Sequence, residues 1–159
     1  MVNEMFENVN NDTSNREISI TRILSAPIDL VWEAWTNPEY IAHWWGPSGF
    51  TNTIHKMDVT AGGEWRLTMH GPDGKNYLNR SKFIEIVPFK KIVFQHYNPD
   101  YIATIIFEPN EKETLMHWTG LFETAELFET LVKVFKADEG LKQNVEKLEN
   151  YLLQNMKDK

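Results

Sequence analysis

Six short segments with a two-residue repeat constrain the fold of this chain more than any other feature. They are Thr51–Val59, Glu64–His70, Asn76–Val87, Lys91–Tyr97, Tyr101–Glu108 and Thr114–Glu123. Every linker between them carries turn residues such as Gly62-Gly63 or Asn98-Pro99-Asp100, which favour tight reversals of the chain. Connections this short pair neighbouring strands antiparallel, so the sequence predicts an antiparallel meander.

One strand and two short helices are expected before the meander. Glu17–Leu24 alternates well enough for a strand. Pro27–Thr36 has apolar residues at helical spacing behind a proline that suits a first helical turn. Asn37-Pro38 then reads as the capped start of a shorter helix that runs to Trp44.

Thr124 is expected to be an N-cap, and after it apolar residues recur at helical spacing as far as Leu152. Gly140 either ends one helix or lies inside a single long helix, where it costs about 1 kcal/mol relative to alanine. We favour the long helix, preceded by a short one. The predicted fold class is therefore α+β, with a curved antiparallel sheet of about seven strands wrapped around the C-terminal helix.

Composition limits the kinds of function that the chain can have. The 159 residues fit one domain, expected over residues 16–156 behind a flexible tail of residues 1–15 that lacks the features of a secretory signal. Cysteine is absent and no apolar run approaches the roughly 20 residues that span a bilayer, so we expect a cytoplasmic protein. The formal charge of −7 is scattered along the chain, which argues against nucleic acid as a partner.

The run Trp44-Trp45-Gly46-Pro47-Ser48-Gly49-Phe50 places three aromatic rings on a loop. Rings of this size must be covered. Two interpretations are open: Trp44, Trp45 and Phe50 either gate a cavity and contact a ligand, or they plug one end of the core.

The polar residues form no recognisable catalytic constellation. The five histidines lack the i, i+2 and i, i+4 spacings that metal sites favour. Glu64 and Arg66 are expected to form a charge pair on the solvent-exposed face of their strand. Arg80 lies an even number of residues from Leu78, Ile84 and Ile86, so its side chain is expected to point inward with theirs unless a bulge shifts the register. There is no Gly-x-Ser-x-Gly turn and no glycine-rich phosphate loop. We therefore expect no cofactor, no metal and no catalytic residue.

The aromatic loop, together with Val31-Trp32-Glu33-Ala34-Trp35-Thr36-Asn37-Pro38-Glu39, Gly62-Gly63-Glu64-Trp65-Arg66 and Met69-His70-Gly71-Pro72-Asp73-Gly74, resembles the heat-shock-protein-90 ATPase-activator-like family. The resemblance runs from about Glu17 to Leu153. It implies the helix-grip fold of START-like, polyketide-cyclase-like and Bet v-like domains, with an internal cavity between sheet and helix. The sequence departs from the family at Thr60, where an arginine is common, and at Leu141, where a tryptophan is common and where the smaller side chain implies a roomier cavity.

The resemblance implies a set of ligand-binding candidates in this cavity: Trp35, Trp44, Trp45, Phe50, Trp65, Met69, Arg80, Phe83, His117, Trp118, Phe122, Phe135, Gly140 and Leu141. The favoured function is binding of an unidentified hydrophobic or amphipathic small molecule. Two alternatives are a co-chaperone that activates a chaperone ATPase and an enzyme of the cyclase or hydrolase kind. The sequence leaves open whether the chain forms a homodimer.

Overall fold

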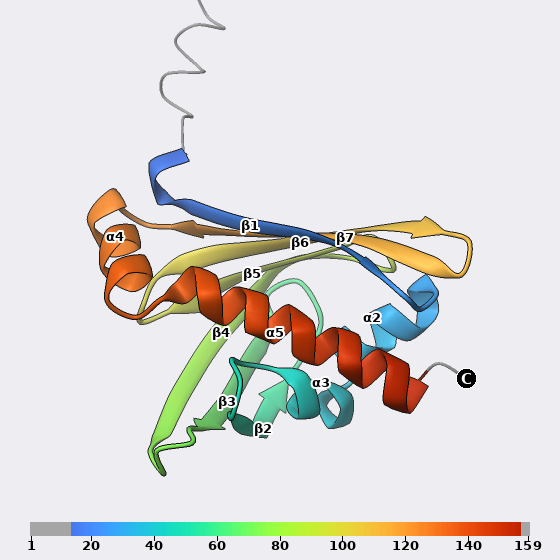
Figure 1. Cartoon of the computed structure of the whole chain (residues 1–159), viewed down its shortest axis with the longest axis horizontal. Coiled ribbons are helices and arrows are strands. Elements are labelled where there is room, and N and C mark those ends of the chain that lie inside the picture. Colours follow the sequence, from blue (N-terminus) through green and yellow to red (C-terminus); the bar gives the residue numbers. More distant parts are fainter. Residues whose placement is uncertain (1–13, 157–159) are drawn as a thin grey trace, which may run out of the picture.

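In a computed structural model, which describes residues 14–156, a seven-stranded antiparallel sheet curves around one long helix (Figure 1). Most of the expected tail, residues 1–15, lies outside the described residues. The elements in chain order are η1 (Ser14–Arg16), β1 (Glu17–Leu24), α2 (Ile28–Thr36), α3 (Pro38–Trp44), β2 (Thr51–Met57), β3 (Glu64–His70), β4 (Asn76–Val87), β5 (Lys91–Tyr97), β6 (Tyr101–Asn110), β7 (Glu113–Phe122), α4 (Ala125–Lys133), α5 (Ala137–Tyr151) and η2 (Leu152–Met156).

The predicted meander is confirmed, with the strand order β1-β7-β6-β5-β4-β3-β2. The first strand pairs with the last, so β1 and β2 form the two edges of the sheet. The bounds of β1, β3, β4 and β5 match those expected from the sequence. Strand β2 has a bulge between Ile54 and Lys56 and stops two residues early. The chain turns after Met57, where the Thr60 amide donates to the Asp58 carbonyl at 2.9 Å.

The helices begin where the capping residues predict. The side chain of Asn37 accepts a hydrogen bond from the Glu39 amide at 2.9 Å, and the Thr124 hydroxyl accepts one from the Leu127 amide at 3.0 Å. Lys136 has a left-handed backbone with φ of 53°, which separates α4 from α5. Gly140 lies inside α5 and donates to the Lys136 carbonyl at 3.0 Å. The long helix preceded by a short one is therefore confirmed.

A cluster of aromatic rings fills the core at the end of the sheet that α2 and α3 cover. The Trp35 ring lies 4.9 Å from both the Trp44 and the Trp118 rings, and Trp65 stacks on Phe83 at 5.8 Å. Val145 and Leu148 on the C-terminal half of α5, and Leu152 at the start of η2, are fully buried and belong to the same cluster. Because this half of α5 is sealed by packing, any space between helix and sheet must lie beside its N-terminal half.

Candidate ligand cavity

A mostly apolar cavity of about 260 Å³ lies between the N-terminal half of α5 and the concave face of the sheet. The helix and the α4–α5 junction form one wall, strands β1, β3, β4, β6 and β7 form the other, and the aromatic loop closes one end. The lining residues are Ile18, Trp45, Gly46, Pro47, Met69, Asn79, Pro99, Tyr101, Trp118, Gly120, Phe122, Leu131, Phe135, Lys136, Ala137, Gly140, Leu141 and Asn144.

The aromatic loop is fastened to α5 by hydrogen bonds. The Lys147 ammonium donates to the carbonyls of Trp45 and Pro47 at 3.2 Å and of Phe50 at 3.1 Å. The Ser48 amide donates to the Gln143 side chain at 3.1 Å. Burial lowers the pKa of Lys147 and so disfavours its charged form. The three carbonyl acceptors nevertheless suit a charged ammonium donor. This loop is therefore held as a fixed wall.

The three rings of the loop have three different environments, so neither sequence interpretation covers all of them. Trp44 is fully buried in the core, where its indole N–H donates to the Ala34 carbonyl at 3.0 Å. Trp45 stacks on Trp118 with ring centroids 5.6 Å apart and lines the cavity. Phe50 packs on Tyr77 at 5.9 Å outside it.

A polar group formed by Asn79, His96 and Tyr101 lies in the sheet wall. The imidazole of His96 has its Nδ1 2.8 Å from the Pro99 carbonyl oxygen and its Nε2 2.7 Å from Asn79 Oδ1. Its ring stacks on Tyr101 with centroids 4.6 Å apart. Burial lowers the pKa of His96, against the opposing effects of the Pro99 carbonyl and Asp100. Burial also raises the pKa of Tyr101 above its ordinary value, so the phenol stays protonated.

Asn144 supplies the corresponding polar group in the helix wall. It is 7% exposed, and its Oδ1 is buried without a hydrogen-bond partner. Asn79, Tyr101 and Asn144 were not among the sequence candidates. Asn144 falls on the buried stripe of α5, one turn from both Leu141 and Leu148, and this spacing is the signal that identifies it.

Half of the fourteen sequence candidates lie at the cavity: Trp45, Met69, Trp118, Phe122, Phe135, Gly140 and Leu141. Four others, Trp35, Trp44, Trp65 and Phe83, are packed in the core. Phe50, Arg80 and His117 do not line the cavity. Whether any of the fourteen contacts a ligand stays a prediction.

Arg80 and His117 both point away from the cavity. Leu78 and Ile84, which share the sequence parity of Arg80, are themselves 85% and 47% exposed, and Ile86 follows a register shift between Phe83 and Glu85. The guanidinium is exposed and lies 4.9 Å from the centre of the Tyr97 ring. The inward arginine, expected in the absence of a bulge, is therefore wrong, because Arg80 shares the outer face of the sheet with the exposed Leu78. His117 is exposed and hydrogen-bonds the Thr21 hydroxyl.

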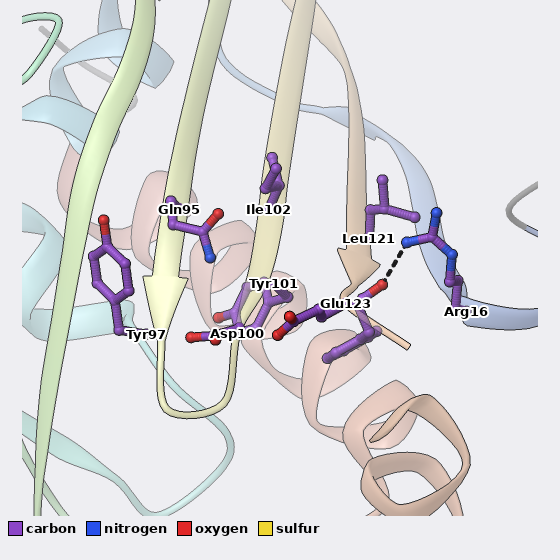
Figure 2. Close-up of a pocket in the computed structure, with 9 residues that line it drawn as sticks. Arg16, Gln95, Tyr97, Asp100, Tyr101, Ile102, Leu121 and Glu123 are labelled. Atoms are coloured by element: carbon purple, nitrogen blue, oxygen red, sulfur yellow. Dashed lines mark hydrogen bonds between the residues drawn. The ribbon is translucent and has the colours of Figure 1, made fainter. Parts of the chain in front are cut away.

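A larger groove of about 480 Å³ lies at the outer face of the sheet (Figure 2). Gln95, Ile102 and Leu121 line it and alternate along their strands with buried residues, so they face away from α5. Arg16 Nη1 donates to the Phe122 carbonyl at 2.7 Å at its edge. This open groove has a mixed polar lining and lacks the enclosing helix.

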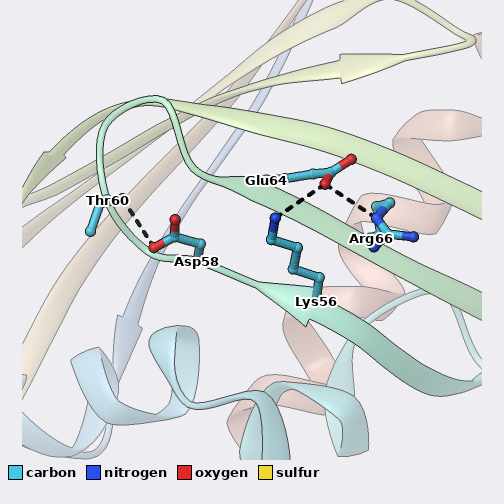
Figure 3. A network of polar contacts seen from close by, with 5 residues as sticks. All are labelled: Lys56, Asp58, Thr60, Glu64 and Arg66. Atoms are coloured by element: carbon cyan, nitrogen blue, oxygen red, sulfur yellow. Dashed lines mark hydrogen bonds and ion pairs between the residues drawn. The ribbon is translucent and has the colours of Figure 1, made fainter.

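The charged residues at the β2–β3 hairpin form an exposed network (Figure 3). Glu64 Oε1 lies 3.3 Å from Arg66 Nε and 3.5 Å from Lys56 Nζ. These half-exposed pairs contribute under about 1 kcal/mol. The Thr60 hydroxyl donates to Asp58 Oδ1 at 3.0 Å. The network confirms the predicted charge pair and is separate from the cavity lining.

Within residues 14–156, no three histidine, aspartate or glutamate side chains gather closely enough to hold a metal ion. None of the helices in that part of the chain has the length and apolar character needed to cross a membrane.

A curved antiparallel sheet that grips a long C-terminal helix around an apolar cavity defines a helix-grip domain of the START-like type. The chain belongs to the family described as activator of Hsp90 ATPase homolog 1-like protein, whose model matches residues 25–153. A comparison with curated proteins gives no significant match.

Solved structures of similar fold come from several bacteria. A Nitrosomonas europaea protein is 24% identical with a TM-score of 0.80, over 89% of this chain and 96% of its own. An Arthrobacter aurescens protein is 24% identical with a TM-score of 0.84, over 92% and 91%. The AHSA1-like protein from Aeromonas hydrophila is 21% identical with a TM-score of 0.69, over 87% and 96%. At these identities the similarity shows the fold alone.

Proposed function

We propose that this protein binds a hydrophobic or amphipathic small molecule between its sheet and α5. The observation that carries the proposal is the apolar cavity of about 260 Å³ beside a densely packed aromatic core. Protein interiors leave few voids larger than a water molecule, and unfilled apolar space costs stability. A cavity walled by Trp45, Met69, Trp118 and Phe122 favours an apolar occupant over water.

Thermal-shift and native mass spectrometry screens of the purified protein with lipids, polyketides and aromatic metabolites test this proposal. A ligand at 100 times its Kd stabilises the folded state by about 2.7 kcal/mol, which corresponds to a Tm rise of about 5–10 °C for a domain of this size. If no compound gives a shift or a bound mass, the proposal is wrong.

A matched pair of variants places any binding in the cavity. Leu141→Trp puts an indole into the cavity wall, whereas Leu153→Trp makes the same change at a position that is 47% exposed. We expect Leu141→Trp to abolish the thermal shift and Leu153→Trp to retain it. Equal shifts in both variants would place the ligand elsewhere.

A co-chaperone role remains the second candidate, because the family takes its name from activation of a chaperone ATPase. Adding the protein to an Hsp90 ATPase assay tests it, and an unchanged rate over a concentration series would contradict it. The enzyme alternative loses its two inward candidates, since Arg80 and His117 are both exposed. A cytoplasmic location and dimer formation stay predictions.

A further inference from the structure

We propose that the cavity selects a compact neutral alcohol or phenol, of one or two rings, whose hydroxyl pairs with the side-chain amide of Asn144. This inference rests on the proposed function and deepens it by naming the class of ligand. Three features carry it: a buried, unpaired amide oxygen in the helix wall, a tyrosine phenol in the sheet wall, and the size and charge of the space between them.

The Oδ1 atom of Asn144 is buried and has no hydrogen-bond partner among residues 14–156, and the residue as a whole is 7% exposed. An asparagine side chain offers both an acceptor and two donors, and buried groups of this kind are nearly always paired in folded proteins. Asn144 lines the cavity one helical turn from Gly140 and Leu141. A ligand in the cavity is therefore placed to complete its hydrogen bonds.

Tyr101 lines the cavity from the opposite wall. Its ring is fixed by stacking on His96 and by an edge contact with Phe122 at 5.3 Å. No hydrogen bond of its hydroxyl is found within residues 14–156, and the residue is partly exposed. A hydroxyl on the ligand both donates and accepts, so it suits the amide of Asn144 and the phenol of Tyr101 alike.

The charge of the lining excludes an ionised group deep in the cavity. None of the residues that line it is acidic, and the only basic one is Lys136, which is exposed at the α4–α5 junction. A charge buried without a partner is strongly unfavourable. A neutral polar group is therefore preferred over a carboxylate or an ammonium.

The volume limits the ligand to a compact molecule. An engineered apolar cavity of roughly 150 Å³ holds one benzene, and drug-sized ligands occupy roughly 300–1,000 Å³. The present cavity of about 260 Å³ lies between these values. Its volume matches one or two fused rings.

Isothermal titration with three matched two-ring probes tests the inference. They are 2-naphthol, 2-methylnaphthalene and 2-naphthoate, which share a body and differ in the polar group. We expect 2-naphthol to bind about 10- to 100-fold more tightly than 2-methylnaphthalene, because the methyl group leaves the buried Asn144 oxygen unpaired. We expect 2-naphthoate to bind more weakly than 2-naphthol.

Equal binding of naphthol and methylnaphthalene would overturn this inference and leave the proposed function intact. Tighter binding of the naphthoate would overturn it in favour of an anionic ligand held by Lys136. Binding of none of the probes overturns the inference on ligand class, whereas the proposed function fails only if the wider screen also finds no ligand.

Two variants assign the preference to named groups. Asn144→Leu is nearly isosteric and removes the unpaired amide oxygen, so we expect a higher Tm without ligand and an equal affinity for naphthol and methylnaphthalene. Tyr101→Phe removes only the hydroxyl, so it keeps the test available if the first variant does not fold, and we expect it to reduce the naphthol preference at least threefold. An unchanged preference in both variants would contradict the assignment.

Discussion

Replacing Gly140 with alanine should stabilise the protein. Gly140 lies in the first turns of α5 with an ordinary helical backbone, and a Cβ built there meets only Pro47 Cγ at 3.7 Å, an ordinary van der Waals contact. Alanine is favoured over glycine inside a helix by about 0.5–1 kcal/mol, chiefly because the unfolded chain loses freedom. We therefore expect a Tm rise of about 1–4 °C, measured by circular dichroism.

Gly62→Ala is the matched control, because it adds the same methyl group where the backbone is left-handed. Gly62 has φ of 87° with nothing within 4 Å of the added Cβ, so the space is free and only the backbone opposes the change. We expect destabilisation by roughly 1 kcal/mol. If Gly140→Ala also destabilises the protein, the helical geometry or the free space at Gly140 is wrong.

The same methyl group separates stability from binding. Gly140 lines the cavity, so the added Cβ narrows the space while it strengthens the helix. We expect Gly140→Ala to bind two-ring ligands more weakly although it unfolds at a higher temperature, a trade-off common at binding sites. Unchanged affinity would show that ligands do not reach this turn of α5.

Three further predictions concern single side chains. Lys147→Met should lower the unfolding free energy by about 1–2 kcal/mol in urea, because three loop carbonyls lose their donor, whereas the exposed Lys142→Met should change it by less than about 0.5 kcal/mol. Burial lowers the pKa of His96 below 6.5, so on acidification the unfolded state binds this proton before the folded state does, and stability should fall as pH drops through about 6.5 toward the folded-state pKa. His96→Gln should flatten this pH dependence. A folded-state pKa above 6.5, measured by NMR titration, would contradict the prediction. Arg80→Ala should leave stability within about 0.5 kcal/mol and ligand affinity unchanged, and a loss of affinity would place the guanidinium in the site.

The strand bounds could be predicted because alternation and turn residues are both local signals. The orientation of Arg80 could not. Leu78, Ile84 and Ile86 share the parity of Arg80, but Leu78 and Ile84 are exposed apolar residues, and Ile86 follows the register shift at the Phe83/Glu85 bulge. Alternation in the sequence reveals neither an exposed leucine nor a bulge.

The candidate site was predicted less completely than the fold. Indole and phenyl rings fill a core or line a cavity with the same sequence pattern, so Trp35 and Trp65 could not be distinguished from Trp45 and Trp118. Asn144 was detectable in principle, because a polar residue one turn from both Leu141 and Leu148 interrupts a buried stripe. Tyr101 gave no signal, since an aromatic residue at the start of a strand is ordinary.

The two ends of the cavity are held in place by different numbers of contacts. This difference decides whether the aromatic loop can act as a gate. That loop is joined to α5 by Lys147 and Gln143, so moving it as a gate would break four hydrogen bonds. At the other end, Phe135 lines the cavity yet is 69% exposed, and Lys136 breaks the helix there. Few contacts oppose displacement of this junction. We therefore expect a ligand to enter beside the α4–α5 junction, with the tryptophan loop as the fixed end of the cavity.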